Sequence, residues 1–290
     1  MRSCINQRGF TGASAPGALL FSSRIPLVLR GFLAQGLLAS LVLLSTGCIT
    51  QTESVFTSEA SMQDAMEQRV ALARQYIGQG NWEDAKRNLK AAVEISDRNP
   101  EIYEAYALVY QSTGEVELAE QSFKRAISLD KKFSRARNNY AAFLFSQERY
   151  EEAEAQLNEV VKDTLYNARP TAFANLGLAR LQLNDSAGAE EAFSRSLSMQ
   201  PESVLALLEL AILRLDAGDP GSAQGYYRDY RRLLRVQSPR GLWFGVRLAR
   251  ATGNQDAESS YALALRNLYP NSPEYAEYQR SIGASPRSGG

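Results

Sequence analysis

The chain has 290 residues, of which 44% are hydrophobic and 22% charged, a composition that excludes a disordered protein and fits one or two globular domains. It contains no histidine, which excludes Ser-His and Cys-His dyads and HExxH metal sites. Basic and acidic residues balance at 32 each. Residues 1–47 hold four arginines and no acid, so the remaining chain is mildly acidic and nucleic acid is not an expected partner.

Residues 1–47 are predicted to form a signal peptide. Their apolar stretch, residues 31–44, fits the core of about 7–15 residues found in such signals and is shorter than the ~20 of a membrane span. Ser45-Thr46-Gly47-Cys48 follows and resembles the lipobox of bacterial lipoproteins, although leucine, valine or isoleucine usually stands in the place of Ser45. The first ~23 residues lack the charged form of a signal's start, which suggests an overlong start.

We therefore expect a covalent lipid on Cys48 and no other cofactor, with residues 48–65 forming a lipidated flexible tether. Ile49, rather than aspartate, follows the cysteine, which in bacterial lipoproteins favours the outer membrane, so attachment facing the periplasm is expected. Two alternatives remain at this point: a transmembrane anchor over residues 32–49 and a buried structural cysteine.

A period of about 34 residues organises the chain from residue 66 to 271. Three position classes recur six times, a small residue, an alanine twelve positions later, and a large residue four positions after that. The small residues are Ala73, Ala107, Ala141, Gly177, Ala211 and Gly245. The alanines are Ala85, Ala119, Ala153, Ala189, Ala223 and Ala257. The large residues are Leu89, Phe123, Leu157, Phe193, Tyr227 and Tyr261.

This is the tetratricopeptide pattern, and it predicts an all-α, right-handed superhelical solenoid of six helical hairpins followed by a C-terminal capping helix. Small residues let the two helices of a hairpin approach closely, and the large residue packs against the next hairpin. The predicted domain covers 66–280, with repeats at about 66–99, 100–133, 134–169, 170–203, 204–237 and 238–271 and a frayed tail at 281–290. Gly80, Gly114 and Gly218 are predicted turn residues.

A partner-binding surface is predicted on the first helices, which line the concave face of such a fold. The residues expected there are mostly polar or mixed in the first three repeats, including Glu67, Arg74, Glu101 and Glu104. In the fourth and fifth repeats they become apolar, as Leu178, Leu181, Leu205, Leu208, Ile212 and Leu215. Such a patch indicates a groove for a helix or an extended segment, unless neighbouring helices cover it.

The third repeat carries two surplus residues in segment 162–170. A loop there lengthens a connection between hairpins, and Leu165 and Tyr166 give it a possible contact role. Catalytic motifs are absent from the sequence: there is no glycine-rich phosphate loop, CxxC or DxD cluster, and the adjacent pair Glu151-Glu152 points in two directions on a helix. We expect a binding protein, not an enzyme, and a monomer without a metal site.

Several segments outside the generic repeat positions carry a further resemblance. They are Asn138-Asn139-Tyr140, Asp163-Thr164-Leu165-Tyr166, Asn175-Leu176-Gly177-Leu178, Gly245-Val246-Arg247-Leu248-Ala249 and Leu268-Tyr269-Pro270. With the lipobox they make the chain resemble the type IV pilus biogenesis and stability lipoproteins, the PilF/PilW pilotin family.

The resemblance implies an outer-membrane lipoprotein that binds the type IV pilus secretin and promotes its localisation and multimerisation. An alternative is a periplasmic repeat lipoprotein that serves as a scaffold for another envelope-assembly machine. An enzyme with an appended repeat domain is excluded in practice, because no unassigned stretch of ~100 residues remains for a catalytic domain.

Overall fold

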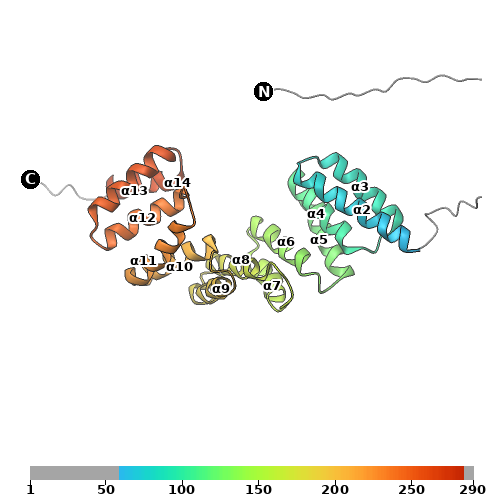
Figure 1. The fold of residues 1–290 in the computed structure, drawn as a ribbon, viewed down its shortest axis with the longest axis horizontal. Helices are drawn as coiled ribbons and strands as arrows, with labels where there is room; N and C mark the ends of the chain where they lie inside the picture. Colours follow the sequence, from blue (N-terminus) through green and yellow to red (C-terminus); the bar gives the residue numbers. More distant parts are fainter. Residues whose placement is uncertain (1–58, 284–290) are drawn as a thin grey trace, which may run out of the picture. The chain divides into compact units, whose positions relative to one another are not determined.

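The computed structural model describes residues 59–283, and every regular element within this range is an α-helix (Figure 1). The first hairpins are formed by α2 (Glu59–Gly78), α3 (Trp82–Ile95), α4 (Pro100–Thr113), α5 (Val116–Leu129), α6 (Ser134–Ser146) and α7 (Tyr150–Val160). The later ones are formed by α8 (Arg169–Gln182), α9 (Ser186–Met199), α10 (Val204–Asp216), α11 (Pro220–Arg232), α12 (Pro239–Ala251) and α13 (Gln255–Leu268), and α14 (Pro273–Gly283) follows.

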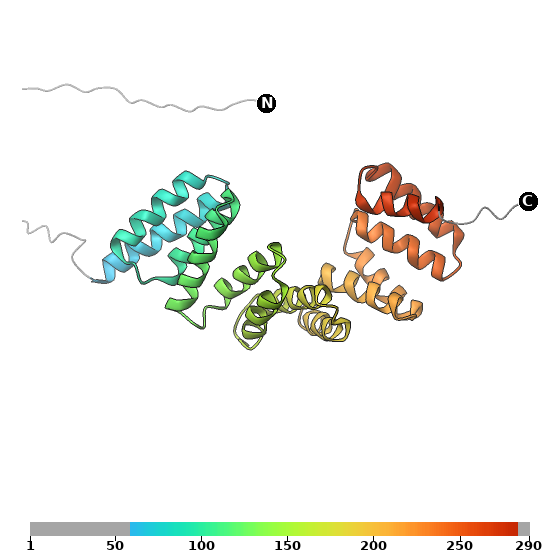
Figure 2. The same ribbon diagram turned by 180° about the vertical axis from the view of Figure 1, so that it is seen from behind.

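Consecutive helices pair into six hairpins over the described residues, from α2/α3 to α12/α13 (Figures 1 and 2). The second helix of each hairpin contacts the first helix of the next, and α14 packs against α12 and α13. Apart from α14, contacts therefore join near neighbours along the chain, as expected for a repeat protein. The predicted all-helical solenoid of six hairpins with a capping helix is confirmed.

The turn inside each hairpin contains one left-handed residue, which stands five residues before the repeat alanine in the first five hairpins. Gly80, Gly114 and Gly218 have φ values of 72°, 84° and 80°, as their predicted turn role requires. In the sixth hairpin the left-handed residue is again a glycine, Gly253, one position closer to its alanine. In the third and fourth hairpins Glu148 and Asn184 adopt φ values of 60° and 61°. The turn geometry is thus constant even where the sequence lacks glycine.

Side-chain caps mark where several helices begin. Asn81, Asp185 and Asp219 each accept a hydrogen bond from a backbone N–H in the first turn of a second helix. Asn99 and Ser203 do the same for first helices. These caps end one helix and start the next within a few residues, which keeps the hairpins short and regular.

Small residues lie where the two helices of a hairpin approach, as predicted. The six positions beginning with Ala73 and ending with Gly245 are all buried. A Cβ atom on Gly177 would lie 2.6 Å from the ring of Phe193, and one on Gly245 would collide with Tyr227. A side chain at either glycine therefore requires the neighbouring ring to move.

The fifth and sixth hairpins depart from the general packing. Tyr230 stands where earlier repeats carry alanine, valine or serine, yet it is fully buried. Gly241 on α12 makes room for it, because a Cβ there would collide with the hydroxyl of Tyr230. In the last hairpin Ala257 and Tyr261 are only half-buried, since no full hairpin follows to cover them.

The two ends of the repeat domain differ from the predicted boundaries. Helix α2 begins at Glu59, so residues 59–65, expected to belong to the flexible tether, are helical. These residues favour helix and include no glycine or proline, and Met66 is fully buried in the first hairpin's core. At the other end α14 extends through Gly283, into the segment predicted to fray.

Candidate protein-binding surface

The predicted apolar patch lies on α8 and α10 and is partly open. Leu178 and Leu181 on α8 pack beside the core around Phe193. Leu208 is buried with 6% exposure, whereas the other five predicted residues, Leu178, Leu181, Leu205, Ile212 and Leu215, are half-buried. The patch therefore offers the edges of several aliphatic side chains rather than fully exposed leucines. Its role in binding stays a prediction.

A small cavity of about 100 Å³ lies at the α8 end of this patch, between α6, α7 and α8. Its walls are mostly apolar and include Phe145, Leu157 and Leu178, with the amide of Asn175 as a polar group. A cavity of about 150 Å³ can bind benzene, so this smaller one suits a single aliphatic side chain. It gives the apolar patch a defined recess.

The first helices of the first three hairpins meet at a buried carboxylate. Glu104 on α4, expected to line the exposed surface, is fully buried. It accepts hydrogen bonds from Arg74 on α2 and from Asn139 on α6, the latter at 2.6 Å, and Arg135 lies 3.8 Å away. The carboxylate is enclosed because charged partners come from both neighbouring repeats, which compensates its loss of water.

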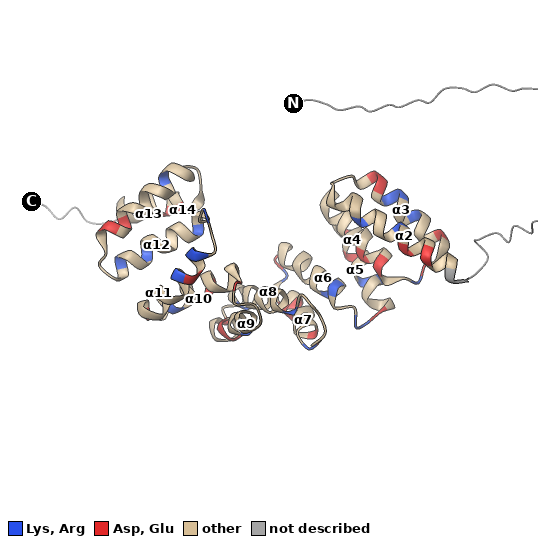
Figure 3. Cartoon of the chain, viewed as in Figure 1, with Lys and Arg blue, Asp and Glu red and all other residues tan. Residues whose placement is uncertain are grey.

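An open cavity of about 630 Å³ adjoins this network and is lined by Glu67, Arg74, Glu101 and Arg135 among others. Both charge signs are therefore present at its walls. Figure 3 shows the same mixture along the whole described domain, with acidic and basic residues interspersed from α2 to α14. This part of the surface suits polar contacts with either sign of charge.

The connection with the two surplus residues is an ordered loop with one exposed apolar side chain. Asp163 accepts hydrogen bonds from the hydroxyl of Ser134 at 2.5 Å and from the backbone N–H of Leu165 at 3.0 Å. These bonds, that from Ser134 first, lower the pKa of Asp163. Tyr166 packs against the core of the second to fourth hairpins, and Leu165 projects with 89% of its surface exposed.

Sequence reasoning missed two features of the carboxy-terminal hairpins. Glu209 on α10 is buried, and its one charged partner in the described structure is Arg240 at 2.7 Å. Its second oxygen has no hydrogen-bond partner there, and burial raises the pKa of this carboxyl. A cavity of about 460 Å³ also opens between α11, α12 and α13. The only sequence signal for the buried Glu209 was a glutamate within an otherwise apolar stretch.

The remaining predictions concern chemistry and the membrane. No group of three or more metal-ligating side chains occurs within residues 59–283. Over the same residues no helix is both long and apolar enough to cross a bilayer. Cys48 and the predicted signal peptide lie outside the described residues, so the lipid anchor stays a prediction.

Comparison with known proteins identifies the repeats. Tetratricopeptide repeat families match residues 70–132 and 175–239 in one case and 114–165 in the other. The type IV pilus assembly protein PilF of Pseudomonas aeruginosa is 36% identical over 235 residues, which cover 81% of this chain and 93% of PilF.

Solved structures give the same relationship. A structure of Pseudomonas aeruginosa PilF matches with a TM-score of 0.72 and 36% identity, covering 76% of this chain and 99% of the other. PilW, described as a widely conserved type IV pilus biogenesis factor, matches with a TM-score of 0.66 and 26% identity over 74% of this chain and 98% of its own. The similarity extends over nearly the full length of both relatives.

Proposed function

Because this chain belongs to the PilF/PilW family of tetratricopeptide-repeat proteins of type IV pilus biogenesis, we propose that it acts as a pilotin. In this role it is a non-catalytic outer-membrane lipoprotein that binds the pilus secretin and promotes its localisation and multimerisation. The observation that carries the proposal is the match to PilF over 81% of the chain.

The proposed mechanism has two parts, an anchor and a binding surface. The anchor is the lipid on Cys48, which follows an apolar stretch and precedes the repeat domain. Attachment of several acyl chains holds a protein stably on a bilayer, whereas one chain binds only marginally. The domain then remains at the inner surface of the outer membrane, where a secretin subunit has to be inserted.

The binding surface combines the apolar patch on α8 and α10 with Leu165. Half-buried leucines and a small apolar cavity favour capture of an aliphatic segment. Leu165 is held out by a loop whose Asp163 and Tyr166 are fixed by a hydrogen bond and by core packing. A rigid, exposed leucine contributes contact area at small entropic cost on binding.

Deletion of the gene tests the role itself. The expected result is loss of surface pili and a fall in the fraction of secretin found as multimers, measured by electron microscopy and by gel analysis without full denaturation. Cells with Cys48→Ser should keep the folded protein but lose both its membrane attachment and most secretin multimers. Normal pili and normal multimers in the deletion strain would contradict the proposal and leave the general envelope scaffold as the alternative.

Labelled palmitate tests the anchor separately from the repeat domain. The wild-type protein should incorporate the label, and the Cys48→Ser variant should not. Label that persists in the variant would exclude Cys48 as the lipidation site.

Leu165→Asp tests the binding surface with little risk to folding, because the side chain is already 89% exposed. We expect unchanged stability and reduced secretin multimers. Val236→Asp is the matched control, since Val236 is 61% exposed in another connection between hairpins. Equal secretin assembly in the two variants would show that Leu165 is not part of the binding surface. Leu208 is less suitable for such a test, because an aspartate at a buried site would unfold the domain.

A further inference from the structure

The junctions between the central hairpins share one ion pair. At the third junction Arg180 on α8 donates to Glu154 on α7 at 2.9 Å. At the fourth junction Arg214 on α10 donates to Glu190 on α9. The two arginines are 34 residues apart and the two glutamates 36, the lengths of a repeat, so the pairs occupy equivalent places. Each pair closes the space between a second helix and the next first helix.

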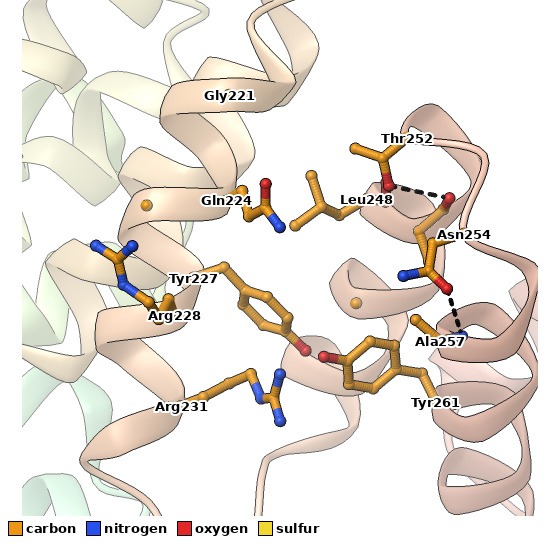
Figure 4. A pocket seen from close by; sticks show the side chains of 13 residues that line it. Gly221, Gln224, Tyr227, Arg228, Arg231, Leu248, Thr252, Asn254, Ala257 and Tyr261 are labelled. Atoms are coloured by element: carbon orange, nitrogen blue, oxygen red, sulfur yellow. Dashed lines mark hydrogen bonds between the residues drawn. The ribbon is translucent and has the colours of Figure 1, made fainter.

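The fifth junction lacks this pair. The equivalent positions, 34 residues further along, hold Gln224 and Leu248. Both residues line the cavity of about 460 Å³ between α11, α12 and α13, where they face each other (Figure 4). The cavity therefore opens at the junction where the repeated glutamate and arginine are missing.

The walls of this cavity carry positive charge without a compensating acid. Arg228 and Arg231 are among the lining residues, which include no aspartate or glutamate. Arg231 stands where the preceding repeats have apolar residues, namely Val93, Ile127, Val161 and Leu197. In the described part of the chain Arg231 has no carboxylate within 4 Å. Arg228, itself exposed, has only the partly buried Asp229 at 3.5 Å, and Asp229 also pairs with Arg232.

Two tyrosine rings hold Arg231 at the cavity. Its guanidinium carbon lies 5.5 Å from the centre of the Tyr261 ring and 6.0 Å from that of Tyr227. Figure 4 shows both rings and the arginine directed toward the same space. Such contacts orient the guanidinium and leave its N–H groups available to an incoming acceptor.

We propose that this cavity binds an acidic segment of a protein partner. A glutamate or aspartate of the segment takes the place of the glutamate that Gln224 replaces, and its carboxylate pairs with Arg231 and Arg228. The rest of the segment covers the half-buried ring of Tyr261 and the edges that Leu248 and Tyr227 leave exposed. A small inorganic anion satisfies only the arginines, so the apolar walls favour a peptide. None of the six apolar residues predicted to bind the secretin lines this cavity.

Fluorescence anisotropy of the purified repeat protein tests the site with a labelled peptide of alternating glutamate and leucine. The matched probe replaces each glutamate by glutamine. We expect saturable, salt-sensitive binding of the acidic peptide and much weaker binding of the amide peptide. Equal affinity for both peptides would overturn the proposal, as would complete displacement of the acidic peptide by low-millimolar inorganic phosphate.

Two variants locate the binding in this cavity. Arg231→Leu restores the apolar residue type of the earlier repeats, and Gln224→Glu restores their acidic residue. Each variant should lower the affinity for the acidic peptide by roughly tenfold or more. Arg195→Gln is the control, because Arg195 is an exposed residue on α9. Wild-type affinity in both cavity variants, with helicity and melting temperature preserved, would contradict the proposal.

Discussion

The fourth and fifth junctions of the solenoid solve the same packing problem in opposite ways. At the fourth, a small residue on the second helix, Ser196, is equivalent to Tyr230 at the fifth, and Leu207 on the following first helix is equivalent to Gly241. The large side chain is therefore on the first helix of the following hairpin at the fourth junction and on the preceding second helix at the fifth. At the same time the Arg214–Glu190 pair is replaced by Gln224 and Leu248, and a cavity opens.

The difference shows that the repeat conserves the fit between helices rather than the residue at each position. Tyr230 stacks against Tyr227 with ring centres 5.8 Å apart, and its hydroxyl lies 3.2 Å from that of Ser238. A residue that violates the repeat pattern is thus accommodated by a matching glycine on the next helix. Four experiments test this comparison, in order of decreasing expected effect.

Tyr230→Ala should cost about 3–5 kcal/mol of unfolding free energy, the usual result of removing a buried aromatic ring. Adding Gly241→Leu should recover part of this loss, because the pair then resembles the fourth junction. Denaturant unfolding measures both. Ser196→Ala is the control and should be close to neutral, since the buried hydroxyl of Ser196 has no hydrogen-bond partner in the described structure. A double variant no more stable than Tyr230→Ala alone would show that the two positions do not compensate.

Gly241→Ala should lower stability by about 1–3 kcal/mol, because the new methyl group collides with Tyr230. Gly225→Ala on α11 provides a matched comparison at the same junction. Nothing lies within 4 Å of a Cβ there, so this variant should gain about 0.5–1 kcal/mol from its higher helix propensity. Equal effects of the two variants would contradict the close approach at Gly241.

Acidification should weaken the second junction through Glu120, whereas Gln224 at the equivalent place in the fifth junction carries no titratable group. Glu120 on α5 accepts two hydrogen bonds of 2.9 Å from Arg149, and this pairing, with Lys124 and Tyr140, lowers the pKa of Glu120 from 4.5 to about 2. Since the folded-state pKa is the lower one, the ionised carboxylate stabilises the fold above pH 4.5, and this contribution is lost as the pH falls toward 2.

Glu120→Gln should therefore be less stable than the wild type at neutral pH, by on the order of 1–3 kcal/mol. The difference between the two proteins should shrink steadily as the pH falls from 5 to about 2. Thermal unfolding at a series of pH values measures it. Gln224→Ala, at the equivalent place in the fifth junction, should show no such pH-dependent difference. A constant gap between Glu120→Gln and the wild type would exclude Glu120 as the titrating group.

Restoring the ion pair at the fifth junction should have the smallest effect. Because Leu248 is buried, Leu248→Arg alone is the reference, and adding Gln224→Glu to it should recover less than about 1 kcal/mol, since such pairs are partly exposed to solvent. The arginine and glutamate of the fourth junction are 36% and 35% exposed, respectively. Any gain should decrease as salt is added, and chemical denaturation at two ionic strengths measures it. A large, salt-independent gain would indicate filling of the cavity rather than charge pairing.

Much of the fold could be predicted from single positions. The alanine series from Ala85 identified the hairpins, and Gly80, Gly114 and Gly218 identified their turns, because each depends on contacts within one hairpin. The left-handed turn at Glu148 was not predictable, since glutamate carries no local preference for it. The start of α2 at Glu59 was missed for a related reason, because the repeat pattern begins only at residue 66.

The candidate sites were less accessible from sequence. The repeat positions predicted the residues of the apolar patch but not their partial burial. They also predicted that Glu104 lies on an open surface, whereas it is buried beneath Arg74 and Arg135. Side-chain exposure depends on what three neighbouring repeats contribute together. The cavity at the fifth junction was missed because neither Gln224 nor Leu248 alone indicates a cavity. Only the two together show that the ion pair of the preceding junctions is absent.

The sequence alone determined the repeat, the number of hairpins and the family, because a 34-residue period is maintained by contacts between near neighbours in the chain. It also supports the lipid anchor and the secretin partner as predictions. The tertiary structure decided which charges are enclosed, which leucines are open and where a cavity forms. These properties arise from side chains 24–35 residues apart that meet only when successive hairpins stack.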